Sequence, residues 1–323
     1  MLIKEKSEIK FVIIRDTISN DDNMLNISWM CMFAGVSRSG YYRWIGADET
    51  RKVAEEKDKQ DFDLILIAYT FRGFAKGARG IYMRLIHQRP PTIMNLKKIR
   101  RLMKKYALKC PIRNANPHRR MARALKTSLI APNLVNREFR DHGPRTILLT
   151  DITYIRRMDG KFSYLATILD AFTLQVLSYA LSDSLEVDFI LEMIQLLIKN
   201  HGVSLHAETI IHSDQGCHYT SYKFIDIVKS SSLRQSMSRK ANCWDNAPQE
   251  SFFGHMKDDI DITNCYTHEQ IVVAINEWMD YYNNDRYHWD LAKLSPNEYY
   301  DYIKTGIYPL PVSPPRETRV TRL

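Results

Sequence analysis

The stretch SMSRKANCWDNAPQESFFGHMK, residues 236–257, decides how the fold of the whole chain is interpreted. Its first part is rich in residues that favour loops and turns. The DNAP segment at 245–248 predicts the start of a helix, because a capping residue followed by proline in the first turn is a common start signal. From there Glu250 and Lys257 fall on one helical face. A lone glutamate on such a face is ordinarily a solvated residue, so its meaning depends on the strands upstream.

Two apolar stretches upstream each contain an aspartate. TILLTDITYI at 146–155 is a β-branched run typical of a buried strand, with Asp151 inside it. TIIHSDQG at 209–216 is a shorter strand that ends on Asp214 and a glycine turn. A carboxylate in or at the end of a core strand is costly unless something compensates it. A divalent cation bound by two or three such carboxylates is the simplest compensation.

The spacing of these acids, together with the wording around them, resembles a known family. Asp151, Asp214 and, after 35 intervening residues, Glu250 resemble the DDE catalytic core shared by retroviral integrases and bacterial insertion-sequence transposases. The phrases TDITYI, HSDQG.HYTS and SMSRK.NCWDNAP.ESFFGHMK resemble the insertion-sequence-three family in particular, and this wording covers about residues 130 to 300. The resemblance implies the second-frame catalytic protein of such an element, a DDE polynucleotidyl transferase with an integrase-like core.

In that family the three carboxylates hold two Mg²⁺ ions, roughly 3.5–4 Å apart, on either side of the reacting phosphorus. The resemblance implies that Asp151 bridges both ions, that Asp214 and Glu250 each complete one, and that Mn²⁺ can substitute. It also implies that Lys257 contacts DNA near the reacting end, whereas the residue alone would be read as a surface lysine. The reaction implied is strand cleavage at the element ends followed by strand transfer.

Other side chains near these acids leave alternatives open. Asp170 ends the second expected strand and could lie near the site, although the resemblance gives it no catalytic role. His212 and His218 flank Asp214, so a mononuclear His/Asp metal site is conceivable, without a third ligand at motif spacing to support it. A ribonuclease-H-like nuclease without strand transfer and a non-catalytic DNA-binding regulator of transposition remain alternative functions.

The net charge of +9 comes from one segment. Between Asn95 and Lys126 the chain carries twelve Lys or Arg residues and no Asp or Glu. Such a block indicates a polyanionic partner, here double-stranded DNA. The resemblance specifies this DNA as the terminal inverted repeats of the element and its target. It also implies a homo-oligomer on DNA, and an upstream-frame protein or a frameshift fusion with it as a further partner.

The sequence predicts a cytoplasmic protein, and the resemblance implies a bacterial one that associates with the nucleoid when bound to DNA. Neither a signal-peptide pattern nor a run of 18 apolar residues is present, so no membrane association is expected. The five cysteines are scattered without a C-x-x-C pair, which favours reduced thiols over disulfides or a zinc site.

The expected organisation is an α/β catalytic core preceded by all-α DNA-binding segments. Residues 1–60 are expected to hold a helix-turn-helix-like segment, in which a turn around Gly35 and a cap at Ser37 precede a second helix; a plain helical hairpin fits the spacing equally well. Residues 61–108 form a second such domain with a basic helix, 109–144 a basic linker that is poorly ordered without DNA, 145–305 the core, and 306–323 a disordered tail. The DNA-contact candidates are Arg38, Arg43, Lys97, Lys98, Arg100, Arg101, Lys104, Lys105, Arg119 and Arg120.

Within the core, periodicity predicts five strands. Three consecutive strands, at 146–155, 162–170 and 174–180, form a meander, and two more, at 209–214 and 233–237, follow helices at 188–200 and 222–229. This order is that of the ribonuclease H-like fold, a mixed five-stranded sheet with flanking helices. Helices at 267–283 and 287–302 are expected to pack back onto it.

Overall fold

The computed structural model describes residues 7–20, 22–73, 76–110, 130–239, 243–262, 264–312 and 314. The chain divides into two compact units, Met1–Ile65 and Leu66–Leu323. Helix α4 (Asp48–Thr70) contains the boundary between them. None of the helices in the described ranges is long and apolar enough to cross a membrane.

The first unit contains three short helices around a small apolar core. They are α1 (Ser7–Ile18), α2 (Ile27–Ala34) and α3 (Arg38–Gly46). Their buried side chains form one cluster of Ile14, Met30, Cys31 and Tyr41. Helix α1 was not anticipated, because residues 1–26 carry little periodic signal by themselves; its apolar residues become meaningful only against α2 and α3.

The turn between α2 and α3 has the predicted turn at Gly35 and cap at Ser37, which a helix-turn-helix and a plain helical hairpin share. Gly35 takes a left-handed conformation (φ 63°), which ends α2 and lets its N–H bond to carbonyls of the last turn. The Ser37 hydroxyl accepts a 3.0 Å hydrogen bond from the Gly40 N–H and so caps α3. Arg38 and Arg43 are exposed on α3.

The second unit begins with a helical part. A short 3-10 helix (Phe71–Gly73) follows α4, and α5 (Ala78–Ile86) packs against α6 (Leu96–Lys105). Asn95 caps α6 by accepting from the Lys97 N–H at 2.8 Å. The buried face of α6 carries Ile99, Leu102 and Met103. The basic residues lie off this face, all exposed except the half-buried Lys98: Lys97, Lys98, Arg100, Arg101, Lys104 and Lys105.

The core is a five-stranded mixed sheet in the order β3-β2-β1-β4-β5. The antiparallel meander consists of β1 (Ile147–Arg156), β2 (Phe162–Asp170) and β3 (Val176–Ser182). The strands β4 (Ile210–Ser213) and β5 (Arg234–Met237) extend it in parallel with β1. This is the predicted ribonuclease H-like arrangement.

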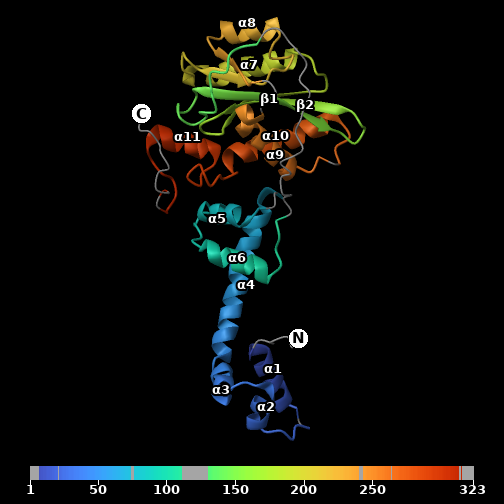
Figure 1. Ribbon diagram of the computed structural model, residues 1–323, viewed down its shortest axis with the longest axis vertical. Coiled ribbons are helices and arrows are strands. Elements are labelled where there is room, and N and C mark those ends of the chain that lie inside the picture. Colours follow the sequence, from blue (N-terminus) through green and yellow to red (C-terminus); the bar gives the residue numbers. More distant parts are fainter. Residues whose placement is uncertain are drawn as a thin grey trace. The chain divides into compact units, whose positions relative to one another are not determined.

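Helices cover both faces of this sheet, as Figure 1 shows. One face packs against α7 (Asp188–His201) and α8 (Tyr222–Ser230), and a 3-10 turn (Gly202–Ser204) follows α7. The opposite face packs against α9 (Ala247–Asp259), which a 3-10 turn (Cys243–Asn246) precedes, and α10 (His268–Asn284). Side chains alternate along β1, so that Leu149 belongs to the α9 side and Leu148 to the α7 side.

The third strand begins two residues later than predicted, at Val176. Residues 170–175 form a turn instead, closed by a 2.8 Å hydrogen bond from the Leu174 N–H to the Asp170 carbonyl, with Leu174 at φ 58°. Leu174 and Gln175, which were assigned to the strand in the prediction, therefore belong to this turn.

The C-terminal half of the expected linker belongs to the core. Val135 is 1% exposed inside the α9-side cluster. The Leu134 N–H donates to the Ser236 hydroxyl at 2.9 Å, and the Met237 N–H donates to the Pro132 carbonyl. The expectation of a linker to residue 144 was therefore wrong for residues 130–144, because Pro and Asn concealed a segment that packs beside β5. Residues 111–129, which include Arg119 and Arg120, lie outside the described residues.

The beginning of the expected tail also packs on the core. Helix α11 (Pro296–Thr305) carries Tyr299, which forms a small cluster with Leu291 and Leu294. Leu310 packs against this cluster, and the Tyr308 hydroxyl donates to the Ala292 carbonyl at 2.7 Å. Disorder was therefore the wrong expectation for these first tail residues, because two apolar side chains anchor them.

Candidate active site

The parallel pairing of β1 and β4 brings two of the three predicted acids to the same level of the sheet. Ile147 pairs with Ile210 and Leu149 with His212, a constant offset of 63 residues. Continued by two residues, this register sets Asp151 opposite Asp214, the first residue after β4. Neighbouring positions of paired strands direct their side chains to the same face. Both aspartates therefore project from the face on which Leu149 lies, the face that α9 covers.

The first turn of α9 lies beside Asp151. Thr167 of β2 is the antiparallel partner of Asp151, and its hydroxyl accepts a short hydrogen bond from the Gln249 side chain. The Asn246 amide donates to the Thr150 carbonyl at 3.4 Å. Glu250, half-buried, directly follows Gln249 in the same turn. The third predicted acid therefore comes from an element held against the central strand.

The start of α9 differs in one respect from its prediction. Pro248 lies in the first turn as expected. The N-cap residue is Asn246, but in the described part of the chain its side chain makes no capping hydrogen bond to the helix. Asp245 is not a cap either, because its buried carboxylate accepts from Arg137 and Arg239 instead. Two charged donors compete successfully for an acid that would otherwise suit a helix N-terminus.

The pKa values of two nearby tyrosines are affected by both aspartates. The pKa of the buried Tyr219 is raised well above its usual value by burial, and the negative charges of Asp151 and Asp214 raise it further. Burial also raises the pKa of Tyr154, with smaller contributions from neighbours that include the same two aspartates. Tyr219 is anchored beneath the site, where its hydroxyl lies 3.2 Å from that of Thr150.

A backbone N–H group in the loop after β4 holds the side chain of Asp214. The Gly216 N–H donates to Oδ1 of Asp214 at 2.9 Å. Partial desolvation raises the pKa of Asp214, while this hydrogen bond and the neighbouring His218 lower it. Asp214 itself remains exposed, so its carboxylate is accessible from outside the protein.

The donor set fits a hard divalent cation, although the side chains are not gathered around one point. In the ranges that the structure describes, no group of three His, Cys, Asp or Glu side chains is close enough to hold a metal ion. What the fold brings together is two strand positions and one helical turn, all carrying oxygen ligands of the kind that Mg²⁺ prefers. The same place holds two buried amide oxygens without a hydrogen-bond partner, Oδ1 of Asn246 and Oε1 of Gln249. A group of oxygen ligands with unsatisfied acceptors beside it suits a cation or its bound water.

Comparison with known proteins agrees with this fold. Two family models, both described as integrase core domains, match residues 141–243 and 231–296. The "uncharacterized 31 kDa protein" of insertion element IS600 from Shigella sonnei is 30% identical over 270 residues, which are 83% of this chain and 96% of that protein. The putative transposase InsK of IS150 from Escherichia coli K12 is 32% identical over 64% of this chain and 71% of its own length. The transposase InsF of IS3A, also from Escherichia coli K12, is 28% identical over 85% of this chain and 93% of its own length.

The chain belongs to the insertion-sequence-three family of transposases. The general activity of this family is DNA cleavage and strand transfer during transposition, which is polynucleotidyl transfer. The function and the fold class predicted from the sequence are thereby confirmed, and the assignment of individual residues to the chemistry remains a prediction.

The alternative His/Asp metal site finds no support in the transposase. The ring nitrogens of His212 lie 2.8 Å from the Ser236 hydroxyl and 3.3 Å from that of Ser238, and burial lowers its pKa to about 4. His218 is turned toward the Leu185 carbonyl, 3.1 Å from its Nε2. Both rings therefore bind other parts of the protein: His212 of β4 contacts Ser236 of β5 and Ser238 after it, and His218 contacts the backbone at Leu185.

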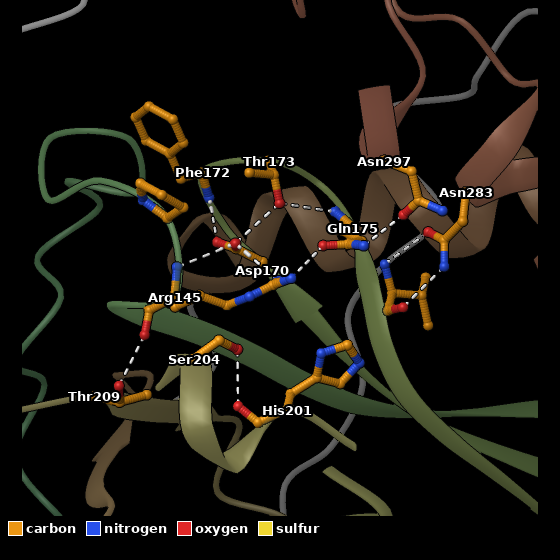
Figure 2. Close-up of polar contacts among 12 residues, drawn as sticks. Arg145, Asp170, Phe172, Thr173, Gln175, His201, Ser204, Thr209, Asn283 and Asn297 are labelled. Atoms are coloured by element: carbon orange, nitrogen blue, oxygen red, sulfur yellow. Dashed lines mark hydrogen bonds and ion pairs between the residues drawn. The ribbon is translucent and has the colours of Figure 1, made fainter. Parts of the chain in front are cut away.

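Asp170, the competing carboxylate, has a structural role. It lies at the far end of β2, paired with Leu148 rather than with Asp151, and is fully buried. Figure 2 shows it accepting from the backbone and guanidinium of Arg145, the Phe172 N–H and the Thr173 hydroxyl. Burial raises the pKa of Asp170, and Arg145 counteracts this. Its oxygens are occupied within the protein, so it is not a metal-ligand candidate.

The same network ties the sheet to the C-terminal helices. Arg145 also donates to the Gln175 side chain, whose amide in turn donates to Asn297 at the start of α11 (Figure 2). Asn283 of α10 exchanges two hydrogen bonds with the backbone of Val176. Sequence reasoning missed this function of Arg145 and Gln175, because their partners are distant in the chain.

The predicted DNA-contact residues are dispersed over the described chain. Lys257 is exposed on α9, two turns after Glu250. The exposed basic residues of α6 and α3 belong to other parts of the chain. The residues that sequence reasoning missed are nearer to the site: Gly216, Gln249, and the arginines Arg137 and Arg239. The SRK and NAPQE motifs, which contain Arg239 and Gln249, were the sequence signal that could have identified these two residues.

Proposed function

We propose that this transposase cleaves and joins DNA strands by a metal-dependent reaction at Asp151, Asp214 and Glu250. The observation that carries the proposal is the 63-residue register between β1 and β4. Continued by two residues, this register aligns Asp151 with Asp214 on the face that α9 covers. Gln249 contacts Thr167, which is the strand partner of Asp151. Glu250 follows Gln249 in the same helical turn and therefore lies in the same region.

Each acid comes from an element that limits its movement. Asp151 lies within the central strand of the sheet, between β2 and β4. Asp214 follows β4 and has one oxygen fixed by the Gly216 N–H. Glu250 lies in a helix whose first turn is bonded to β2. When bound, two Mg²⁺ or Mn²⁺ ions would activate the attacking oxygen and neutralise the leaving one, and rigid placement of the ligands favours that chemistry.

The proposed substrate is double-stranded DNA, as the terminal repeats of the element and as its target. The basic face of α6 supplies phosphate contacts, with Arg38 and Arg43 of α3 as a second group, and Lys257 acts close to the reacting end. A homo-oligomer on DNA is part of the proposal, because cutting two element ends and joining them to one target requires more than one site. An upstream-frame protein, or a fusion with it, is the further proposed partner, acting on DNA in the bacterial cytoplasm.

The test is the Glu250→Gln variant, assayed for strand cleavage on DNA that carries the element's own end sequence, in Mg²⁺. Glutamine keeps the size of the side chain but removes its charge, so fold and DNA binding are expected to survive. Cleavage and joining should both fall by several orders of magnitude, because one metal position loses its protein ligand. Glu277→Gln, an exposed acid on α10, is the matched control and should remain near wild type.

Comparison at matched DNA occupancy decides the outcome. A Glu250→Gln protein that still cuts within about tenfold of wild type would remove Glu250 from the site, because that decrease is too small for a missing metal ligand. Cleavage without joining in the wild type would favour the nuclease alternative. Binding with neither activity in Mg²⁺ or Mn²⁺ would favour the regulator.

A further inference from the structure

Asp245 is a buried acid that holds two arginines from different segments. Its side chain has no exposed surface. It accepts from Nε of Arg137 at 2.8 Å, and from Nε and Nη2 of Arg239 at 2.9 Å each. The Arg239 backbone N–H and the Asn133 amide complete its set of donors. These hydrogen bonds lower the pKa of Asp245 well below its usual value, so the group is an anion under all physiological conditions.

The two guanidinium groups together carry more charge than Asp245 can neutralise. One carboxylate faces two cations, so the cluster of Asp245, Arg137 and Arg239 has by itself a net charge of +1. The Arg137 side chain is 45% exposed and that of Arg239 is 56% exposed. Each is thus fixed at one edge and open to solvent at another. Arginine presents five N–H donors in a planar fork, so a guanidinium bonded on one edge to Asp245 can still bind an external anion.

The backbone at Asn136 and Arg137 is strained, and this conformation points the Arg137 side chain toward Asp245. Asn136 and Arg137 both adopt positive φ angles, 48° and 70°, and neither is glycine. Two successive residues in this region are unfavourable for L-amino acids and are kept only where the surroundings enforce them. Here Asn133 accepts from the N–H groups of Val135 and Asn136. The turn so formed places Arg137 against Asp245.

The arginine pair lies at the sheet edge that carries the candidate active site. Ser213 pairs with Met237, and the Ser238 N–H donates to the Ser213 carbonyl. The continued register sets Ser238 opposite Asp214, and Arg239 is the next residue, two positions after the end of β5. Asp245 precedes Asn246, which is bonded to β1 next to Asp151. Its charge also acts on the His212 ring of β4. The pair therefore lies where the segment after β5 meets the turn before α9, and each of these segments neighbours a strand that carries one of the two aspartates.

We propose that Arg137 and Arg239, held by Asp245, form a clamp for backbone phosphates of the DNA strand that enters the active site. This inference rests on the proposed function, because it takes the adjacent acids as the reacting centre. Guanidinium groups bind phosphate oxygens in a bidentate manner. Their side chains are already ordered by Asp245, so less conformational entropy is given up when DNA binds. The clamp holds the strand in register without reading its bases.

A purely structural function would predict a different response. If the arginines served only to tie residues 133–137 to the segment before α9, replacing them would loosen the protein and slow cleavage. It would leave unchanged the number of ions that DNA binding releases. A phosphate contact, in contrast, contributes to the salt dependence of binding, about 0.9 in the log–log slope for each contact on duplex DNA.

The test measures the affinity of the full-length chain for a fluorescent duplex of about 30 base pairs, across a series of KCl concentrations in EDTA. Arg137→Gln and Arg239→Gln should each reduce the slope by about 0.9, and the double variant by about twice that amount. The Arg→Lys variants keep a charge and should retain most of the slope. Asp245→Asn leaves both cations in place, so its slope should not fall.

Arg234→Gln is the matched control. Arg234 begins β5, at the opposite end of the strand that leads to Arg239, and is 50% exposed in an ion pair with Glu208. Its replacement should leave the slope unchanged. Unchanged slopes in both Arg137→Gln and Arg239→Gln would overturn the clamp, and so would an equal decrease in Arg234→Gln. Because the assay contains no metal, it is independent of cleavage, and a failure of the Glu250 test would leave its result interpretable.

Discussion

Gly216 donates its backbone N–H to Oδ1 of Asp214 at 2.9 Å, and a Cβ added to this glycine would lie 2.9 Å from the same oxygen. A carbon atom that close to an oxygen must displace one of the two. The absence of a side chain at Gly216 is therefore what allows the loop after β4 to hold the carboxylate. The glycine has a steric function at the site, independent of any turn conformation.

Gly216→Ala should lower DNA strand cleavage by tenfold or more, because the added methyl group displaces the Asp214 carboxylate from its position. Misplacement of a reacting group by about 1 Å can cost on the order of a hundredfold. The fold should persist, since Asp214 is exposed and its loop lies at the sheet edge. Gly202→Ala is the matched control, because its nearest atom, in Ile198, would be in ordinary contact at 3.5 Å. Equal cleavage by the two variants would show that the Asp214 position is not critical.

Asp170→Asn should destabilise the core rather than inactivate the site. It removes the charge that compensates Arg145, a side chain only 3% exposed. Breaking a buried pair by removing one partner costs about 3–5 kcal/mol. The measurement is the free energy of unfolding in urea. Asp188→Asn removes an acid that is 69% exposed and paired with Lys223, and should change stability by less than about 1 kcal/mol.

The opposite pattern would reassign Asp170. If Asp170→Asn kept its stability and no longer cleaved DNA at matched occupancy, then Asp170 would belong to the reacting centre and Arg145 would be satisfied in another way.

The strands could be predicted because their apolar runs are long and contain few competing signals. Asp151 and Asp214 stood out for the same reason, since an acid inside such a run demands an explanation. The register that aligns them was beyond sequence reasoning, because the pairing of β1 with β4 depends on how α7, which connects β3 to β4, packs on the face of the sheet, and it leaves no local pattern. The spacing to Glu250 was informative only through a family resemblance.

Residues 133–137 illustrate the opposite situation. Asn and Arg in this segment, with Pro132 just before it, indicated a linker, yet Val135 is buried and Arg137 is bonded to an acid more than a hundred residues away. Local composition reports the preferences of the isolated chain, whereas these contacts depend on β5 and the turn before α9 already being in place. The helix start with Pro248 in its first turn was predictable. The use of Asp245 to bind two arginines instead of capping the helix was not predictable, because it depends on the same distant contacts.

Lys76 should give the protein a distinct dependence on alkaline pH. Burial lowers its pKa from 10.5 to about 8, and its ammonium group donates to the Phe71 carbonyl at 2.7 Å. Between pH 8 and 10.5 the unfolded chain therefore binds more protons than the folded one at this group, so this group makes stability rise with pH in that window. Lys76→Met should remove the rise and stabilise the protein near pH 7, by about 1–3 kcal/mol.

Urea unfolding of both proteins from about pH 7 to pH 10.5 measures this difference, since other titrating groups are common to the two. Lys199→Met, on the exposed side of α7, should follow wild type throughout. A difference between Lys76→Met and wild type that stays constant with pH would show that Lys76 titrates as an exposed lysine.

The basic face of α6 should carry a large part of the affinity for DNA. Changing Arg100, Arg101, Lys104 and Lys105 together to glutamine should flatten the salt dependence of duplex binding by about 0.9 log–log units for each phosphate that the helix no longer binds. The helix should survive, because its buried face consists of Ile99, Leu102 and Met103 and glutamine is a good helix former. Binding measured by fluorescence anisotropy over a range of salt concentrations gives the slope, and circular dichroism verifies the helix.

The control removes the same number of charges from another surface. It replaces four exposed residues of α7, α8 and β5 by glutamine: Lys199, Lys223, Lys229 and Arg234. If net charge alone governed binding, both quadruple variants would weaken it equally. A slope that falls only in the α6 variant assigns the phosphate contacts to that helix, because counterion release depends on the phosphates bound locally and not on the total charge. An unchanged slope in the α6 variant would remove this helix from the DNA interface and leave the twelve basic residues between Asn95 and Lys126 without their expected function.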